Sequence, residues 1–280
     1  MVGAMDQINE TDVARHYGAS DLLDRILAGL EGAGVSLDAV KPEDLAPVDE
    51  FHTGGRAATQ YALAKMGLAS QDHVLDVGCG IGGATRYLAS DLGCKVAGVD
   101  LTPEYIDTAR ELANLTGLGD SIDYRAASAL DMPFADETFD AAITLHVAMN
   151  IQDRPGLYRE VARVMKPGGT FCLFDIMRGN GDALAFPVPW AQTAETSHLT
   201  TPDETVELLR GAGFEVGETE DRTQFALDFF RERMAAAGDG PPPLGLHLLL
   251  GPTARQKMAN VLENLEEGRI VPAVMMARKT

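Results

Sequence analysis

Short apolar runs alternate with helically spaced segments through the middle of the chain. The first run is His73–Val77, and it ends at a glycine-rich turn, as buried parallel strands do. Further runs follow at residues 95–100, 122–125, 139–145 and 170–174. This alternation predicts an α/β fold of the Rossmann-like, doubly wound type, with a mostly parallel sheet covered by helices on both faces.

The last third of the chain is less regular. A helix is expected from Thr201 to about Gly211, then a strand near residues 214–219 and a final, antiparallel strand near residues 269–279. About fifty residues separate these two strands, which is too long for a hairpin. Helical patterns near residues 224–236 and 253–266 predict that the interval forms a helical cap insertion, around residues 222–268.

The first seventy residues differ from the rest in pattern and in charge. Helical spacing covers about residues 12–30 and 56–66, and a segment rich in proline and aspartate between them predicts a loop. We therefore expect an N-terminal helical lid over residues 1–70. The remaining residues, 71–280, would form the sheet domain with its cap.

The composition of the chain restricts the kinds of partner that we expect it to bind. The 280 residues include 45% hydrophobic residues, 42 acids and 23 bases, a net charge of -19. Such a charge repels phosphate backbones, so we expect no nucleic-acid partner. No apolar run is long enough to span a bilayer, and the three cysteines show no CxxC spacing. These features predict no integral membrane association and a cytoplasmic location, and they leave the oligomeric state open.

The most informative segment is the turn after the first run. Gly78, Gly80 and Gly83 satisfy GxGxxG, and Asp100 ends the next run twenty residues after Gly80. Glycines at such a turn let the backbone approach a ligand, and an acid at the end of the neighbouring strand can accept both ribose hydroxyls. The alternative is structural, with the glycines serving tight packing and Asp100 capping a helix near Thr102. Together the two features favour an adenosine-containing ligand.

Five ordered motifs carry a family resemblance. They are residues 74–83 (VLDVGCGIGG), 98–101 (GVDL), 127–134 (ASALDMPF), 136–140 (DETFD) and 163–169 (RVMKPGG). This order resembles the class I S-adenosylmethionine-dependent methyltransferases, above all the small-molecule branch that includes ubiquinone/menaquinone, tocopherol and sterol methyltransferases. The resemblance implies S-adenosyl-L-methionine as the cofactor and a small-molecule methyl acceptor as the partner.

The resemblance also implies roles for residues of the first motif. Gly78, Cys79 and Gly80 would line the methionine part of the cofactor. Asp76 would support the cofactor's amino group, directly or through water.

Two further motifs supply the adenosine contacts. Asp100 would hold the ribose hydroxyls, and Leu101 would pack on the adenine. Related proteins often carry an acid where this chain has Ser128, so that contact with the adenine amino group is in doubt. The backbone amides of Ala129 and Leu130 would still recognise the adenine edge.

Methyl transfer from a sulfonium needs positioning, and it needs a base only when the acceptor is protonated. His146 is the candidate base, because it follows the run at residues 139–145 at the carboxyl edge of the sheet. The alternative is that it only lines the cofactor pocket. Asn150 and Asp175 are candidates for orienting the acceptor. No HExxH or CxxC spacing occurs, so no metal site is expected.

Several residues outside the motifs allow both functional and structural interpretations. Arg56 would meet the methionine carboxylate or remain solvated, and Tyr17 would face the cofactor or belong to the core. Trp190 would line an acceptor pocket or simply pack.

The predicted function is methyl transfer to a small molecule by in-line displacement. Two alternatives remain open from the residues. The glycine turn and Asp100 also suit an NAD(P)-dependent oxidoreductase, and a protein that binds the cofactor without turnover would have the same motifs.

Overall fold

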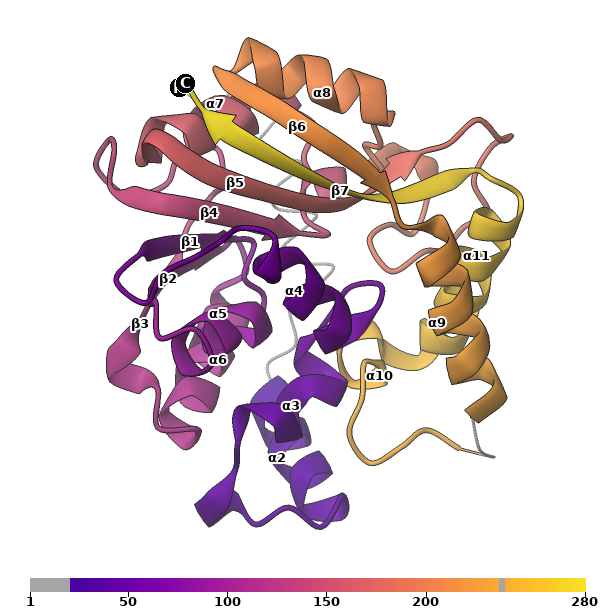
Figure 1. Ribbon diagram of the computed structural model, residues 1–280. Coiled ribbons are helices and arrows are strands. Elements are labelled where there is room, and N and C mark those ends of the chain that lie inside the picture. Colours follow the sequence, from indigo (N-terminus) through magenta and orange to yellow (C-terminus); the bar gives the residue numbers. More distant parts are fainter. Residues whose placement is uncertain (1–20, 237–239) are drawn as a thin grey trace.

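The computed structural model describes residues 21–236 and 240–280. In these residues a twisted sheet of seven strands forms the centre of the molecule, in the order β3-β2-β1-β4-β5-β7-β6 (Figure 1). The strands are β1 (His73–Val77), β2 (Lys95–Asp100), β3 (Ile122–Ala126), β4 (Phe139–Leu145), β5 (Met165–Arg178), β6 (Phe214–Asp221) and β7 (Ile270–Lys279). The predicted fold class is confirmed.

Strand direction follows the predicted pattern. β1 to β5 pair in parallel, and β7 lies antiparallel between β5 and β6. Pro272 occupies the third position of β7, opposite Ile176 of β5, and its carbonyl accepts a hydrogen bond of 2.8 Å from the Arg222 amide. A proline has no amide to donate, and a place near the start of the strand limits that loss.

Helices cover both faces of the sheet. The first face carries α7 (Arg154–Val164) and α8 (Pro202–Gly211), which pack on Leu75, Val99 and Phe171. The opposite face carries α4 (Gly55–Ala64), α5 (Gly83–Ser90) and α6 (Pro103–Leu115), which pack on Val74 and Val96. Alternate residues of one strand therefore enter different cores, as the twofold period of a strand requires.

The N-terminal layer contains one helix more than the pattern predicted. The described chain begins with α2 (Leu22–Gly32), and the earlier part of the predicted helix lies outside the described residues. The predicted loop rich in proline and aspartate is wrong, because α3 (Pro42–Asp49) forms there. Pro42 stands at the first helical position and Asp44 accepts a hydrogen bond of 2.8 Å from the Lys41 amide, so both residues begin a helix.

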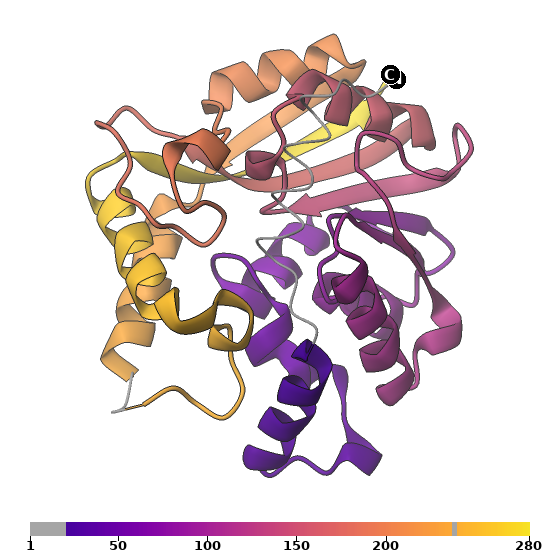
Figure 2. The ribbon, with the colours of Figure 1, turned by 180° about the vertical axis from the view of Figure 1, so that it is seen from behind.

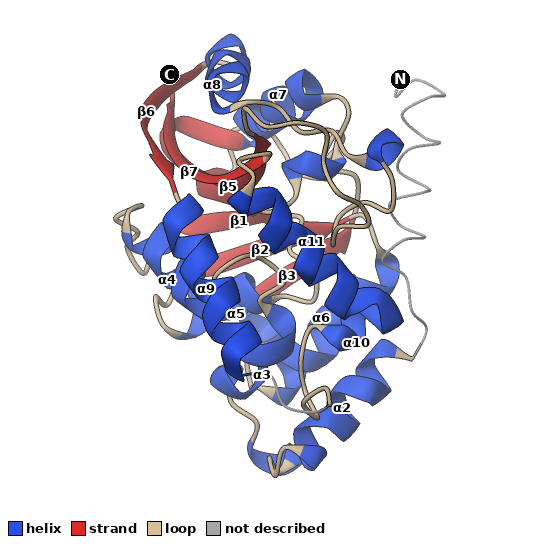
Figure 3. Cartoon of the chain, turned by 90° about the vertical axis from the view of Figure 1, so that its right-hand side faces the viewer, coloured by secondary structure: helices blue, strands red, loops and turns tan. Residues whose placement is uncertain are grey.

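The interval between β6 and β7 is helical, as predicted. It holds α9 (Thr223–Ala236), α10 (His247–Leu250) and α11 (Ala254–Glu266), coloured orange to yellow in Figure 2. α9 and α11 pack around Trp190 and Ile176, while α10 packs against α2 (Figure 3). Through both described ranges, no helix has the length and apolar character to cross a bilayer.

Candidate active site

The glycine loop after β1 wraps over the end of β2. The amides of Gly78 and Cys79 both donate to the Val99 carbonyl, at 2.8 and 2.9 Å. Gly78 has a φ of +76°, and a Cβ there would lie 2.3 Å from Val147 Cγ2. Gly80 has a φ of +53°, but a Cβ there would meet no atom within 4 Å. Gly78 therefore serves close packing, whereas Gly80 borders open space that a ligand can enter.

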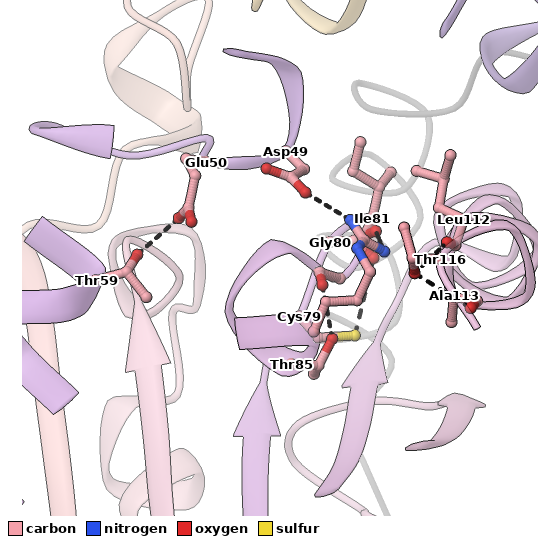
Figure 4. A network of polar contacts seen from close by, with 12 residues as sticks. Asp49, Glu50, Thr59, Cys79, Gly80, Ile81, Thr85, Leu112, Ala113 and Thr116 are labelled. Atoms are coloured by element: carbon pink, nitrogen blue, oxygen red, sulfur yellow. Dashed lines mark hydrogen bonds and ion pairs between the residues drawn. The ribbon is translucent and has the colours of Figure 1, made fainter. Parts of the chain in front are cut away.

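The N-terminal layer is tied to this loop by a buried ion pair. Arg86, in the first turn of α5, donates to Asp49 Oδ2 at 2.6 Å and to the Ile81 carbonyl at 2.8 Å. Both charged side chains are almost completely buried. Burial raises the pKa of Asp49 to about 6, even though Arg86 opposes the shift. Figure 4 shows Asp49 pointing toward the loop at Ile81.

Asp100 lies at the end of β2 and is held by the backbone. Its Oδ2 accepts from the Gly80 amide and its Oδ1 from the Thr102 amide, each at 2.9 Å. Burial raises the pKa of Asp100, and these hydrogen bonds oppose the shift. Asp100 accepts from the amide of Thr102, which is itself the N-cap residue of α6, so Asp100 does not occupy the cap position. A carboxylate offers about four acceptor positions, so these two hydrogen bonds leave room for ribose hydroxyls.

Asp76 is a buried carboxyl group with an unused acceptor. Its Oδ2 has no hydrogen-bond partner within the described residues, and the side chain is 2% exposed. Burial raises the pKa of Asp76 to about 8, and the charges of Asp100 and Glu50 add to the shift. An acceptor in this state favours a ligand that brings a cationic donor.

These residues meet in one cavity at the carboxyl edge of the sheet. Of the predicted cofactor residues, the cavity is lined by Asp76, Gly78, Cys79, Gly80, Asp100, Leu101, Ala129 and Leu130. Ser128 is not part of the lining, and its Oγ accepts a hydrogen bond of 3.0 Å from the Leu130 amide. That amide is consequently already paired.

His146 lies on the same cavity, directly after β4. Its φ is +57°, unusual for a residue with a side chain, and its amide donates to the Phe174 carbonyl at 2.7 Å. The ring packs against Phe174, and its Nε2 is buried without a partner in the described parts of the chain. Burial and the neighbouring His52 hold the pKa of His146 well below its usual value. The imidazole is therefore neutral at physiological pH.

Sequence reasoning missed a polar group contributed by the segment between α3 and α4. His52 Nε2 lies 3.0 Å from Glu50 Oε2 and 2.9 Å from Thr59 Oγ1, and the Thr59 hydroxyl donates to Glu50 at 2.6 Å (Figure 4). Glu50 and His52 line the cavity, and the His52 ring lies 5.7 Å from that of His146. The signal in the sequence was the closely spaced Glu50 and His52, within a segment interpreted as a loop.

Of the two residues considered for orienting the acceptor, only Asn150 lines the cavity. Asp175 is not among the lining residues, and its Oδ2 lies 3.4 Å from Arg154 Nη1 in a buried pair. Burial raises the pKa of Asp175 to about 6 against the charge of Arg154.

The remaining candidates lie away from the cavity. Arg56 pairs with Glu43 at 3.1 Å and lies 3.4 Å from Asp91, so it is not placed to meet the methionine carboxylate. Trp190 is buried beneath the cap and donates to Ser197 Oγ at 2.9 Å. Tyr17 lies outside the described residues. Within residues 21–236 and 240–280, no cluster of side chains suited to a metal ion occurs.

Comparison with known proteins agrees with this geometry. Residues 75–173, from β1 into β5, match the family model described as a methyltransferase domain. The chain carries a methyltransferase domain. The matched range contains the lining residues from Asp76 to Asp153, whereas residues 49–52 and Leu249 line the cavity from outside it. This confirms the predicted resemblance to the methyltransferases.

Individual relatives of this methyltransferase domain are small-molecule enzymes. Methyltransferase GfsG of Streptomyces halstedii is 29% identical over 64% of this chain and 65% of its own length. The sterol 24-C-methyltransferase of Eremothecium gossypii is 36% identical over 47% of this chain and 37% of its own length. The chain thus spans less than two thirds of either relative.

A solved structure shares the whole fold. Geranyl diphosphate methyltransferase in complex with GPP and sinefungin aligns with a TM-score of 0.72 at 19% identity, over 98% of this chain and 100% of that one. At this identity the likeness concerns the fold, including the N-terminal layer and the cap that surround the methyltransferase domain.

Proposed function

We propose that the protein transfers the methyl group of S-adenosylmethionine to a small-molecule acceptor by in-line displacement. The observation that carries the proposal is the buried, unpartnered Oδ2 of Asp76 beside the open cradle at Gly80. The fit of this site to the cofactor follows from its donors and acceptors. Asp76 would accept from the amino group, Asp100 from the ribose hydroxyls, and Leu101 and Ala129 would flank the adenine.

The bound cofactor would supply a methyl carbon already activated by a sulfonium. The chain's own residues then have to position the acceptor and exclude water, which can contribute on the order of 7 to 11 kcal/mol to lowering the barrier. The cavity is walled by the segment between α3 and α4 and by Leu249 of α10, in addition to the strand ends. The N-terminal layer and the cap therefore both contribute to the enclosure.

His146 is proposed as the group that receives the acceptor's proton. Its imidazole is neutral because burial and His52 lower its pKa, and its Nε2 has no partner among the described residues. A neutral imidazole in a residue that lines the cavity has the protonation state that a general base requires.

The test combines binding with turnover. We expect S-adenosylhomocysteine, measured by calorimetry, to bind with a micromolar Kd, and labelled methyl groups from the cofactor to appear on a component of a small-metabolite extract. Binding of NAD(H) without binding of S-adenosylhomocysteine would contradict the proposal. Cofactor binding without any labelled product would instead support a module without turnover.

The His146→Asn variant tests the proton acceptor. Asparagine tolerates the positive φ at this position, so the backbone should keep its path. We expect methyl transfer to slow by about 10² to 10⁴ with cofactor affinity unchanged. An unchanged rate would show that His146 only lines the pocket.

A further inference from the structure

The charged side chains that line the cavity are all acidic in the part of the chain that the structure describes. They are Asp49, Glu50, Asp76, Asp100 and Asp153, and neither lysine nor arginine lines the cavity. Three of these acids have a counter-charge or backbone donors within the protein. Arg86 neutralises Asp49, backbone amides bind Asp100, and the Gly156 amide donates to Asp153 at 2.8 Å.

Three of the lining acids keep a buried oxygen without a partner among the described residues: Asp49 Oδ1, Asp76 Oδ2 and Glu50 Oε1. Asp49 already has Arg86 as its counter-charge, so we consider Asp76 and Glu50 further. Asp76 follows the glycine loop and suits the cofactor's amino group. Glu50 is 3% exposed; its Oε2 receives Thr59 and lies against His52, and its Oε1 is buried with no partner in the described residues. A donor on a bound ligand would satisfy this second carboxylate.

Glu50 is charged rather than protonated. Burial raises its pKa, but the hydrogen bond and charge of His52 and the hydrogen bond of Thr59 outweigh burial, so that the net pKa lies below the ordinary value. A neutral hydroxyl on the ligand would also satisfy Oε1, but a cavity lined by five acids and by neither lysine nor arginine favours a cationic donor. An anionic ligand would be repelled.

Glu50 is close enough to Asp76 for its charge to act on that carboxyl group, and it also lies near the proposed proton acceptor. Its partner His52 packs against His146 and Phe174, with ring centroids 5.7 and 6.0 Å away. These two residues belong to the ends of β4 and β5, whereas the cofactor motifs end β1 and β2. Glu50 therefore stands on the side of the cavity where the proposed proton acceptor lies.

We propose that Glu50 binds the methyl acceptor and that the acceptor presents a protonated amino group. This rests on the proposed methyltransferase function. One N–H of the ammonium donates to Glu50 Oε1, and another proton passes to Nε2 of neutral His146, which becomes an imidazolium. The nitrogen lone pair is thereby freed for attack.

The test uses three probes with one shared skeleton: phenethylamine, 2-phenylethanol and 3-phenylpropanoate. Each is titrated against the full chain saturated with S-adenosylhomocysteine, with binding followed by saturation-transfer NMR. We expect only the amine to bind. Equal binding of the alcohol or the carboxylate would overturn the proposal, as would an amine that does not bind at about 10 mM, enough to occupy a millimolar site.

Variants assign the contact to Glu50. Glu50→Gln should weaken amine binding about tenfold or more, since a hydrogen bond to a charged group is lost, with the Kd of S-adenosylhomocysteine unchanged. The matched control is Glu43→Gln, an exposed carboxylate of α3 that pairs with Arg56, which should leave both affinities unchanged. If Glu50→Gln does not fold, Glu50→Asp keeps the charge but withdraws the carboxylate by one methylene, and should weaken the amine alone.

A loss of cofactor affinity in the Glu50 variants, with amine binding intact, would place Glu50 in the cofactor site and refute the inference. Such a result would leave the methyltransferase function standing. The proposed function itself fails if S-adenosylhomocysteine does not bind the wild-type protein, or if no labelled methyl group appears on any acceptor.

Discussion

Asp76 makes cofactor binding dependent on pH in a direction that the structure specifies. Burial raises its pKa to about 8 in the free protein. At pH 7 about nine-tenths of the molecules therefore carry a protonated Asp76. An ammonium binds to the ionised form, so each binding event at pH 7 should release close to one proton.

The size of this pH dependence follows from the same pKa of Asp76. Below the pKa, affinity for S-adenosylhomocysteine should rise nearly tenfold per pH unit, for a total of about 50-fold between pH 6 and pH 8, and then level off. Calorimetry in buffers of different ionisation enthalpy measures both the affinity and the released proton. The Asp76→Asn variant should lose this dependence and bind about 10 to 150 times more weakly at pH 8.

Stability should change in the opposite direction. The folded-state pKa of Asp76 lies above the unfolded value of 3.8, so its contribution is favourable at low pH and is lost as pH rises toward 8. At pH 7 the free energy of unfolding of the ligand-free Asp76→Asn protein should exceed that of wild type by at most about 4 kcal/mol. If the new amide group stays unpaired, this gain should be smaller by about 1 to 3 kcal/mol. Urea unfolding at several pH values measures this.

Two results would refute this reasoning about Asp76. One is cofactor affinity that does not vary between pH 6 and 8, and the other is an Asp76→Asn variant that binds as the wild type does. The Asp131→Asn variant is the control, because Asp131 is exposed and does not line the cavity.

Further substitutions separate packing from binding. Gly78→Ala should lower the free energy of unfolding by at least about 2 kcal/mol, because its Cβ would clash with Val147 at a positive φ. Gly80→Ala should cost only about 1 kcal/mol in unfolding free energy but weaken cofactor binding, since its methyl group enters open space. Thermal unfolding with calorimetry distinguishes the two, and equal effects would contradict the assignment. Arg86→Met should lower the free energy of unfolding by about 3 to 5 kcal/mol, because it leaves Asp49 unpaired. Adding Asp49→Asn should recover part of this loss, as measured by urea unfolding.

The sequence by itself determined the fold class and which candidate cofactor residues stand at one edge of the sheet. Alternating apolar runs and helical segments are local patterns, and each reports its own element. Residues such as Asp76 and Asp100 stand at the ends of their strands, and parallel strands bring those ends to one edge of the sheet. The structure accordingly found both in one cavity.

Only the tertiary structure decided which residues line the cavity and which pair with other residues outside it. Arg56 lies against Glu43 and Asp91, and Glu50 reaches the cavity because α3 forms where a loop was predicted. These outcomes depend on contacts between residues far apart in the chain, such as Asp49 with Arg86, 37 positions later. The free energy of such contacts comes from burial and charge pairing in the folded molecule, and no local pattern records them.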